Sequence, residues 1–299
     1  MLNTLNKKNL AYLFAALTIL FWGTAASAFK YTLNHFSFIQ LLVWSSLFST
    51  LLLFVIILLS GKFILLKRIN RKEIFPSVYL GLLNPFGYYF ILLRAYELLP
   101  AQVAQPLNFI WPLVLVLLSV PLLGEKLSLK SIVSLLISFF GVVLISSQDN
   151  PMALEIKSPI GVVLALSSSI AWALYWIFNL RYSQIDTVIR LFLNFLFATI
   201  YALAVTIFFP DFWDFNMKGI LGSLYVGFFE MGITFVIWLK ALTLAESKAK
   251  LNNIIYLVPF VSLLFIHFFV GEKIYWTTIV GLCVIVGSIL FQQLKTVKR

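Results

Sequence analysis

The sequence predicts an all-α integral membrane protein whose ten transmembrane helices form two inverted five-helix repeats. Three observations support this prediction. First, 62% of the 299 residues are hydrophobic and 11% are charged, whereas soluble domains are about 45–50% apolar and about 25% charged. Second, ten apolar runs approach the roughly 20 residues that a membrane span requires. Third, a stretch in the middle of the chain recurs near its end, which indicates an internal duplication.

The duplication relates Ala101–Lys126 to Lys248–Lys273. When the two stretches are superimposed, Pro112 falls on Pro259, and both stretches close with Gly-Glu-Lys. Several coincidences within a short stretch, at an offset of about half the chain length, indicate a duplication. They predict a first repeat over residues 1–150 and a second over 151–299.

The ten predicted spans are separated by short connections, the longest of which is a basic loop after the second span. The first span resembles a signal peptide because two lysines precede its apolar run. We expect it to be retained, because it completes the first repeat. The spans are Leu10–Ala28, Phe38–Leu59, Ile74–Leu93, Ala101–Leu123, Ser131–Ser147, Ser158–Leu180, Thr187–Phe209, Gly219–Leu239, Leu251–Val270 and Ile274–Leu294.

The basic residues lie mostly between the apolar runs and predict the orientation in the membrane. With the N-terminus in the cytoplasm, 17 of the 22 Lys and Arg residues fall on the cytoplasmic side and five on the outer side. Such an excess is typical of cytoplasmic loops. The net charge of +11 is therefore interpreted as topology and not as nucleic-acid binding. We expect a multi-pass protein of the cytoplasmic membrane with both termini in the cytoplasm. Five spans per repeat place the two halves in opposite orientations, as in secondary transporters.

The chain offers little to an enzyme. Its single cysteine, Cys283, excludes an internal disulfide and a cysteine-based metal cage. No cluster of His, Asp and Glu and no paired nucleophile and base is visible. We therefore expect no catalytic residue, no metal site and no cofactor.

Glu230 is the acid that lies well inside a span. Charged groups at a helix centre cost about 2.5–3.5 kcal/mol on insertion scales, so they usually face a cavity or a partner. At a shift of 146 residues, Glu230 overlies Asn84 of the third span. The pair predicts a shared central cavity, in which Glu230 contacts substrate or exchanges a proton. The alternative is a protonated glutamate bonded to a neighbouring helix.

Spans four and nine repeat one pattern of polar and aromatic residues. Gln105, Asn108 and Trp111 follow each other at intervals of three, which places them near one helical face. Pro112 and Pro259 predict bends at matched depth, because proline cannot donate a backbone hydrogen bond. The alternative is ordinary packing irregularity. The corresponding candidate residues of span nine are Asn252, Asn253 and Tyr256.

Aromatic residues also gather at the expected depth of the cavity, notably Trp22, Tyr88, Trp111, Trp172 and Trp176. Their rings suit flat or apolar solutes and organic cations. With 17% aromatic residues in the chain, many rings are instead expected at lipid-facing or interfacial positions.

These features together resemble the drug/metabolite transporter superfamily, specifically its EamA-like ten-helix permeases. The resemblance rests on Phe21-Trp22-Gly23, the proline-containing spans four and nine, and the five-plus-five layout. Asn108-Phe109-Ile110-Trp111-Pro112 is similar to the Asn-Tyr-Leu-Trp-Pro element of bacterial aromatic amino acid exporters, with Phe109 in place of tyrosine. Trp172 is similar to a tryptophan in the sixth helix of those exporters.

The resemblance implies a monomer-sized unit, a basket-like cavity, alternating access, and export of amino acids or other metabolites. We expect the partners to be a small solute and the lipid bilayer. A channel, a lipid flippase, and a carrier of another metabolite or drug remain alternatives.

Overall fold

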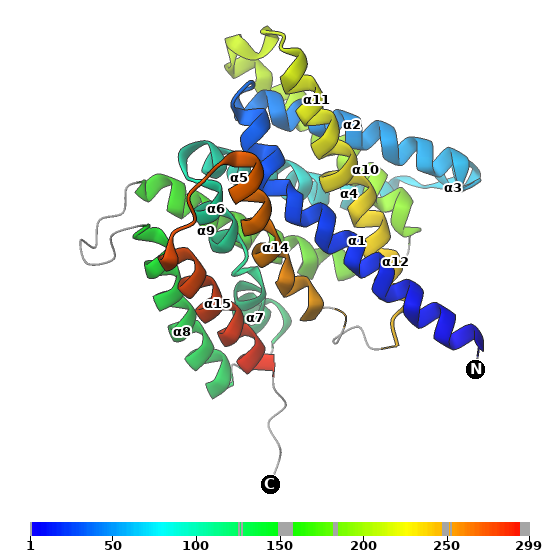
Figure 1. Cartoon of the computed structure of the whole chain (residues 1–299). Helices are drawn as coiled ribbons and strands as arrows, with labels where there is room; N and C mark the ends of the chain where they lie inside the picture. The colour runs from blue at the N-terminus through cyan, green and yellow to red at the C-terminus, as the bar shows by residue number, and fades with distance from the viewer. Residues whose placement is uncertain are drawn as a thin grey trace.

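The computed structural model describes residues 2–124, 126, 128–148, 158–181, 185–246, 251 and 253–293, and these residues form helices joined by short connections. Figure 1 shows the helices gathered into one bundle. The main helices are α1 (Leu2–Leu33), α2 (Phe38–Leu59), α3 (Phe63–Arg68), α4 (Arg71–Gly81), α5 (Tyr88–Leu98), α6 (Ala101–Asn108), α7 (Trp111–Leu123), α8 (Leu129–Ser146), α9 (Pro159–Arg181), α10 (Thr187–Val205), α11 (Met217–Tyr225), α12 (Thr234–Leu244), α14 (Val258–Phe265) and α15 (Trp276–Gln293).

By length and composition, eight helices in the described part of the chain are able to cross a membrane. They are Lys7–Leu33, Phe38–Leu59, Ala101–Leu123, Leu129–Ser146, Pro159–Asn179, Thr187–Phe208, Met217–Leu244 and Trp276–Gln293. A shorter apolar helix covers Ile255–Val270, within the predicted ninth span. The predicted third span does not qualify as one continuous helix, because it is interrupted near Asn84.

The described residues contain three π-helical segments; η7 (Ile266–Val270) ends the ninth span, and the other two interrupt the third and eighth spans. The segment η1 (Leu82–Gly87) joins α4 to α5, and Asn84 within it has extended backbone angles of φ −152° and ψ 122°. The segment η5 (Val226–Ile233) joins α11 to α12 and contains Glu230. Such segments frequently occur at functional sites, because they change the direction in which side chains project. The sequence periodicity predicts neither segment.

The predicted bends of spans four and nine are present. The chain departs from the α-helix at Phe109 and Ile110, and Pro112 lies in the first turn of α7. In the second half, the 3-10 turn η6 (Ile255–Leu257) precedes α14, and Pro259 lies in its first turn. Proline is well tolerated there, because the first N–H groups of a helix have no partner within it.

Glycine ends both of these spans, as the sequence predicts. Gly124 and Gly271 have φ values of +71° and +77°, the left-handed conformation that glycine adopts most readily. Glu125, in the first Gly-Glu-Lys, lies outside the described residues.

Two predicted span boundaries require correction. The first helix continues to Leu33 and the third-span helix to Leu98, so Lys30 and Arg94 belong to helix ends and not to loops. Both cations have local partners that allow this: Lys30 Nζ donates to the Tyr96 carbonyl at 2.6 Å, and Arg94 pairs with Glu97.

The helices pack in pairs that join the first half of the chain to the second. Helix α1 packs on α12 and α14, while α9 packs on α5, α6 and α7; α2 pairs with α10, and α8 pairs with α15. Figure 1 shows α8 and α15 side by side. Gly141 and Gly281 allow the last pair to approach closely, because a Cβ on either would lie 2.8 Å or less from the other helix.

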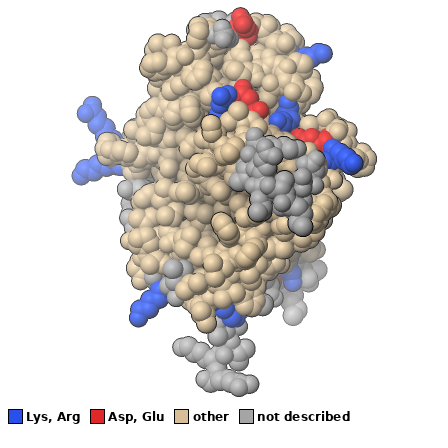
Figure 2. Space-filling model, turned by 90° about the vertical axis from the view of Figure 1, so that its left-hand side faces the viewer, with Lys and Arg blue, Asp and Glu red and all other residues tan. Residues whose placement is uncertain are grey.

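The outer surface is strongly apolar. Leu59, Ile207, Phe208 and Phe269 are each more than three-quarters exposed. On the face shown in Figure 2, a broad zone without Lys, Arg, Asp or Glu separates charged side chains near the upper and lower ends. Lipid tails match such a surface, so it agrees with a membrane protein that contains several apolar helices.

Candidate functional site

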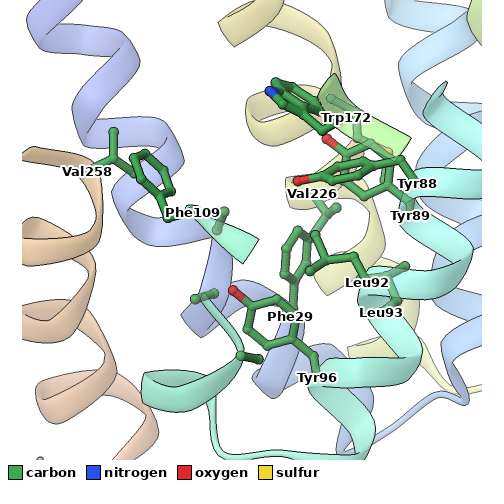
Figure 3. Packing of buried hydrophobic residues seen from close by; sticks show 14 of the residues in the cluster. Phe29, Tyr88, Tyr89, Leu92, Leu93, Tyr96, Phe109, Trp172, Val226 and Val258 are labelled. Carbon is green, nitrogen blue, oxygen red and sulfur yellow. The ribbon is translucent and has the colours of Figure 1, made fainter. Parts of the chain in front are cut away.

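A cavity of about 320 Å³ lies inside the bundle. Helices α1, α5, α6, α7, α9, α12 and α14 contribute to its wall, together with η5 and η6. The following predicted site residues line it: Trp22, Tyr88, Gln105, Asn108, Phe109, Trp111, Trp172, Trp176 and Glu230. Figure 3 shows Phe109 and Val258 together, opposite Tyr88 and Leu92. Segments from both halves therefore build one cavity, in which these nine residues come together.

Trp172 is the centre of the aromatic part of the wall. Its ring centroid lies 4.8 Å from that of Tyr88, 6.0 Å from that of Trp176, 6.4 Å from that of Trp111 and 6.5 Å from that of Trp22. Most of these pairs have steep interplanar angles, which aromatic rings favour because ring edges are positive and faces are negative. The cluster therefore forms a rigid apolar wall with several π faces.

Asn108 connects three elements around the cavity. Its Oδ1 accepts a hydrogen bond of 3.2 Å from the Tyr88 hydroxyl on α5. Its Nδ2 donates to Ser168 Oγ on α9 at 2.7 Å, and Ser168 donates to the Ala165 carbonyl. Asn108 is the last residue of α6. The chain changes direction directly after it, while the two hydrogen bonds fix the side-chain amide. The contacts indicate that Asn108 positions the wall at the junction of α5, α6 and α9.

Glu230 lines the cavity and is 93% removed from solvent contact, with a relative exposure of 7%. Its Oε1 accepts a hydrogen bond of 3.0 Å from the Tyr89 hydroxyl. Its Oε2 has no hydrogen-bond partner among the residues that the structure describes. One carboxyl oxygen is thus satisfied by the protein, and the other is left for a proton or a bound group.

Gln105 Oε1 and Trp172 Nε1 are two further buried polar atoms of the wall without a partner among the described residues. A buried polar atom without a hydrogen bond costs free energy, and in native proteins it usually has water or a ligand as its partner. Together with Glu230 Oε2, these atoms offer two acceptors and one donor to a bound molecule.

Four predicted site residues are not among the lining residues. Asn84 is buried, and its Oδ1 has no partner among the described residues. Tyr256 is buried, and its hydroxyl accepts a 2.7 Å hydrogen bond from Gln293 Nε2. Asn253 is exposed, and Asn252 lies outside the described residues. The matching pattern in span nine therefore contributes Ile255 and Val258 to the wall in place of these polar side chains.

Several lining residues were not predicted, among them Phe29, Leu92, Tyr96 and Trp238. Helical spacing offers a signal for two of them, because Leu92 and Tyr96 continue the face of Tyr88 at intervals of four. Phe29 lies seven residues after Trp22 and so shares its face. In a chain this rich in aromatic residues, that spacing identifies a face without indicating whether the face meets lipid or a cavity.

A second, more polar cavity lies beside the N-terminus of α6 and is lined by Lys30, Glu97, Gln102, Glu272, Lys273 and Tyr275, among others. The Glu272 carboxylate accepts hydrogen bonds from the backbone N–H groups of Ala101 and Gln102, at 2.7 and 3.1 Å. Gln102 in turn donates to the Lys273 carbonyl and accepts from the Tyr275 N–H. The second Gly-Glu-Lys thus fixes its turn, as predicted, and also joins that turn to the first half of the chain.

A solved crystal structure of a protein has the same fold. The two superpose with a TM-score of 0.68 over 96% of this chain and 97% of that one, at 21% sequence identity. Among curated proteins, an uncharacterized transporter of Archaeoglobus fulgidus is 27% identical over 89% of this chain and 92% of its own length. The uncharacterized transporter YvbV of Bacillus subtilis (strain 168) is 25% identical over 77% and 75%. The aromatic amino acid exporter YddG of Ancylobacter novellus is 26% identical over 53% of this chain and 55% of its own length.

The sequence profile of the EamA-like transporter family matches this chain twice, over residues 9–147 and 159–292. These two matches cover most of the chain, and the residues between them are few. With the apolar bundle and relatives that are named as transporters, the matches confirm the resemblance predicted from the sequence. The chain therefore belongs to the EamA-like transporter family.

Proposed function

We propose that this protein is a secondary transporter that carries a small organic solute across the cytoplasmic membrane by alternating access. The observation that carries the proposal is the aromatic cavity, which is built from both halves of the chain. Its volume of about 320 Å³ falls at the lower end of the range of about 300–1,000 Å³ for small-molecule sites. A carrier needs such a site, whereas a channel needs a continuous polar path.

The proposed architecture is ten spans in two inverted repeats, with boundaries at 1–150 and 151–299. Three matched features support it. The π-helical segments around Asn84 and Glu230 occupy equivalent places, and so do the helix breaks that precede Pro112 and Pro259. The helix pairs also exchange roles between halves, because α1 packs on α12 and α14 as α9 packs on α5 and α7. Rocking of one half against the other would expose the cavity alternately to each side.

In this proposal the solute is an amino acid or a related metabolite, and the usual direction is export. The support is the similarity to the aromatic amino acid exporter over about half of each chain. Gln105 would hydrogen-bond polar groups of the solute, Asn108 would hold the wall in place, and Trp111 and Trp172 would pack on its side chain. Glu230 is the candidate for proton coupling, because it is an acid in the wall with one carboxyl oxygen free. One chain would suffice for transport, with both termini in the cytoplasm.

Counterflow in proteoliposomes tests the proposal. Vesicles preloaded with unlabelled phenylalanine should take up labelled phenylalanine faster than empty vesicles, because a carrier returns loaded. Trp111→Ala should abolish this stimulation, since Trp111 lines the cavity and contacts Trp172. Trp276→Ala is the matched control, because Trp276 is exposed at the start of α15. Uptake without stimulation from inside would instead indicate a channel.

A pH gradient tests the proton coupling separately. Coupling through Glu230 predicts that an imposed gradient accelerates net uptake in the wild type and not in Glu230→Gln, while exchange in Glu230→Gln continues without a gradient. Glu246→Gln serves as the control, because Glu246 is exposed and pairs with Lys8 outside the cavity. Equal acceleration in all three proteins would show that Glu230 is not the coupling group.

A further inference from the structure

The residues of the cavity wall that can carry charge are of one sign. Glu230 is its carboxylic acid, and no Lys, Arg or His is present among the described residues that line it. A buried charge is costly unless a charge of opposite sign or several hydrogen bonds accompany it. The wall therefore offers a carboxyl group that can pair with a cation and, among the described residues, no basic group that can pair with an anion.

We propose that the solute is a small organic amine, whose ammonium group lies beside Glu230 and whose apolar part packs against the tryptophans around Trp172. This inference rests on the proposed transport function and names the substrate class of the same site. Among the amino acids and related metabolites proposed above, it selects amines that lack the carboxylate, because a carboxylate on the solute would face Glu230 and weaken binding.

The unsatisfied atoms of the wall favour a donor. Glu230 Oε2 and Gln105 Oε1 are buried acceptors without partners among the described residues, whereas Glu230 Oε1 is already bonded to Tyr89. An ammonium group carries three N–H donors and no acceptor. It can therefore donate to either of these oxygens, and its hydrogen bond to a carboxylate is of the stronger, charge-assisted kind.

The aromatic rings add to the same preference. Tyr89 donates to Glu230, the Tyr88 ring lies 4.7 Å from that of Tyr89, and the Trp172 ring lies 4.8 Å from that of Tyr88. Ring faces attract cations, and tryptophan does so most strongly. Tyr88 and Trp172 line the same cavity as Glu230, so rings that can attract a cation lie in the wall that holds the carboxyl group.

Lys30 and Arg190 do not line this cavity, so neither pairs with a solute carboxylate there. Lys30 Nζ donates to the Tyr96 carbonyl at 2.6 Å and lines the second cavity, beside Glu97 and Glu272. Arg190, on α10, lines neither cavity. A carboxylate in the central cavity would meet only neutral donors, such as Trp172 Nε1, while facing Glu230.

Four compounds that share a phenyl group on a two-carbon chain and differ in charge test the proposal. They are phenethylamine, its neutral isostere 2-phenylethanol, phenylalanine and 3-phenylpropionate. Binding to the purified full-length protein in detergent is measured by calorimetry. We expect phenethylamine to bind most tightly and 3-phenylpropionate most weakly. Phenethylamine should exceed 2-phenylethanol in affinity by about tenfold or more, the scale of one hydrogen bond to a charged group.

Variants assign this preference to Glu230. Glu230→Gln should reduce the affinity for phenethylamine by about tenfold or more and leave that for 2-phenylethanol within about twofold, because only the charge is removed. Glu230→Asp should retain the preference for the amine. Glu246→Gln, an exposed carboxylate outside the cavity, should bind all four compounds as the wild type does.

Several results would overturn the proposal. Phenylalanine or 3-phenylpropionate binding as tightly as phenethylamine would contradict the amine class, and so would equal binding of phenethylamine and 2-phenylethanol. These comparisons use the wild type, so they decide the matter even if Glu230→Gln fails to fold. Phenylalanine counterflow without amine binding would leave the transporter and remove this inference. Glu230-dependent amine binding without any counterflow would leave this inference and remove the transporter.

Discussion

Asp186 and Lys62 form an ion pair between residues that are far apart in the sequence. Lys62 Nζ lies 2.7 Å from Asp186 Oδ2. Asp186 Oδ1 also accepts hydrogen bonds from the Val188 and Ile189 N–H groups, so the same carboxylate caps α10. Burial alone raises the pKa of Asp186, but Lys62 and the two N–H groups outweigh it and lower the pKa below its ordinary value of 3.8.

This ion pair predicts a pH-dependent stability. An acid whose pKa is lowered by folding stabilises the folded state above its unfolded pKa, and loses this effect as the pH falls through its folded pKa. The wild type should therefore unfold at a higher temperature than Asp186→Asn at pH 6, and this difference should shrink below about pH 4. Asparagine caps helices about as well as aspartate, so the variant removes the charge and keeps the cap.

Thermal unfolding in detergent between pH 6 and pH 3 measures this difference. Glu246→Gln is the control, because its partner Lys8 is largely exposed and exposed pairs contribute little. A gap between the wild type and Asp186→Asn that stays constant over this pH range would contradict the prediction.

At the scale of elements, the interruptions of the helices position the side chains of the cavity wall more directly than the lengths of the helices do. The break after Asn108 lets its side chain reach both Tyr88 and Ser168, and the π-helical segment η5 carries Glu230 into the cavity wall. The bends at Pro112 and Pro259 are predictable from the sequence, because proline fixes its own φ angle and cannot donate a backbone hydrogen bond. The π-helical segment around Glu230 contains no proline. Its extra residue per turn is stabilised by packing against neighbouring helices, which the sequence pattern does not show.

The cap that Glu272 provides to α6 gives an element-scale prediction. The first N–H groups of a helix lack partners within it, and here Glu272 accepts two of them from across the molecule. Glu272→Ala should lower the free energy of unfolding by about 0.5–2 kcal/mol, the range for removing a helix cap. Denaturant unfolding in mixed micelles measures this effect, with Glu246→Ala as the control. Equal stability of the two variants would show that water replaces the cap.

At the scale of the whole molecule, the pairing of helices between halves decides where the cavity lies. The tight contact of α8 with α15, which depends on Gly141 and Gly281, joins the last helix of each half at the side of the bundle. The pairs that α1 and α9 form surround the cavity, and these two helices contribute Trp22 and Trp172 to its wall.

The predicted orientation is testable on the whole chain. In a background of Cys283→Ser, Lys218→Cys should react with a membrane-impermeant maleimide in intact cells, because the predicted orientation places residue 218 on the outer side of the membrane. Lys72→Cys should react only after the membrane is permeabilised. Both lysines are exposed in the structure, so access to the reagent depends on the side of the membrane. The reverse pattern would overturn the 17-to-5 assignment of basic residues.

The sequence by itself determined the membrane class, most of the helices and the family. These follow from local properties: apolar runs of about 20 residues, proline and glycine at helix breaks and ends, and a repeat that is visible in one dimension. It also offers Trp22, Asn108, Trp111, Trp172 and Glu230 as candidates, because polar or bulky side chains in apolar spans are conspicuous, and all five line the cavity.

The tertiary structure alone decided which of the candidate residues meet. It turned Tyr256 toward Gln293 and left Asn253 exposed, although their spacing resembles that of the residues around Asn108. It also brought Phe29 and Tyr96 into the wall, where the sequence shows only two more aromatic residues among many. The physical reason is that lipid and a protein cavity both accept apolar side chains. Periodicity therefore reveals a helical face, whereas only the packing of distant helices determines whether that face meets lipid or solute.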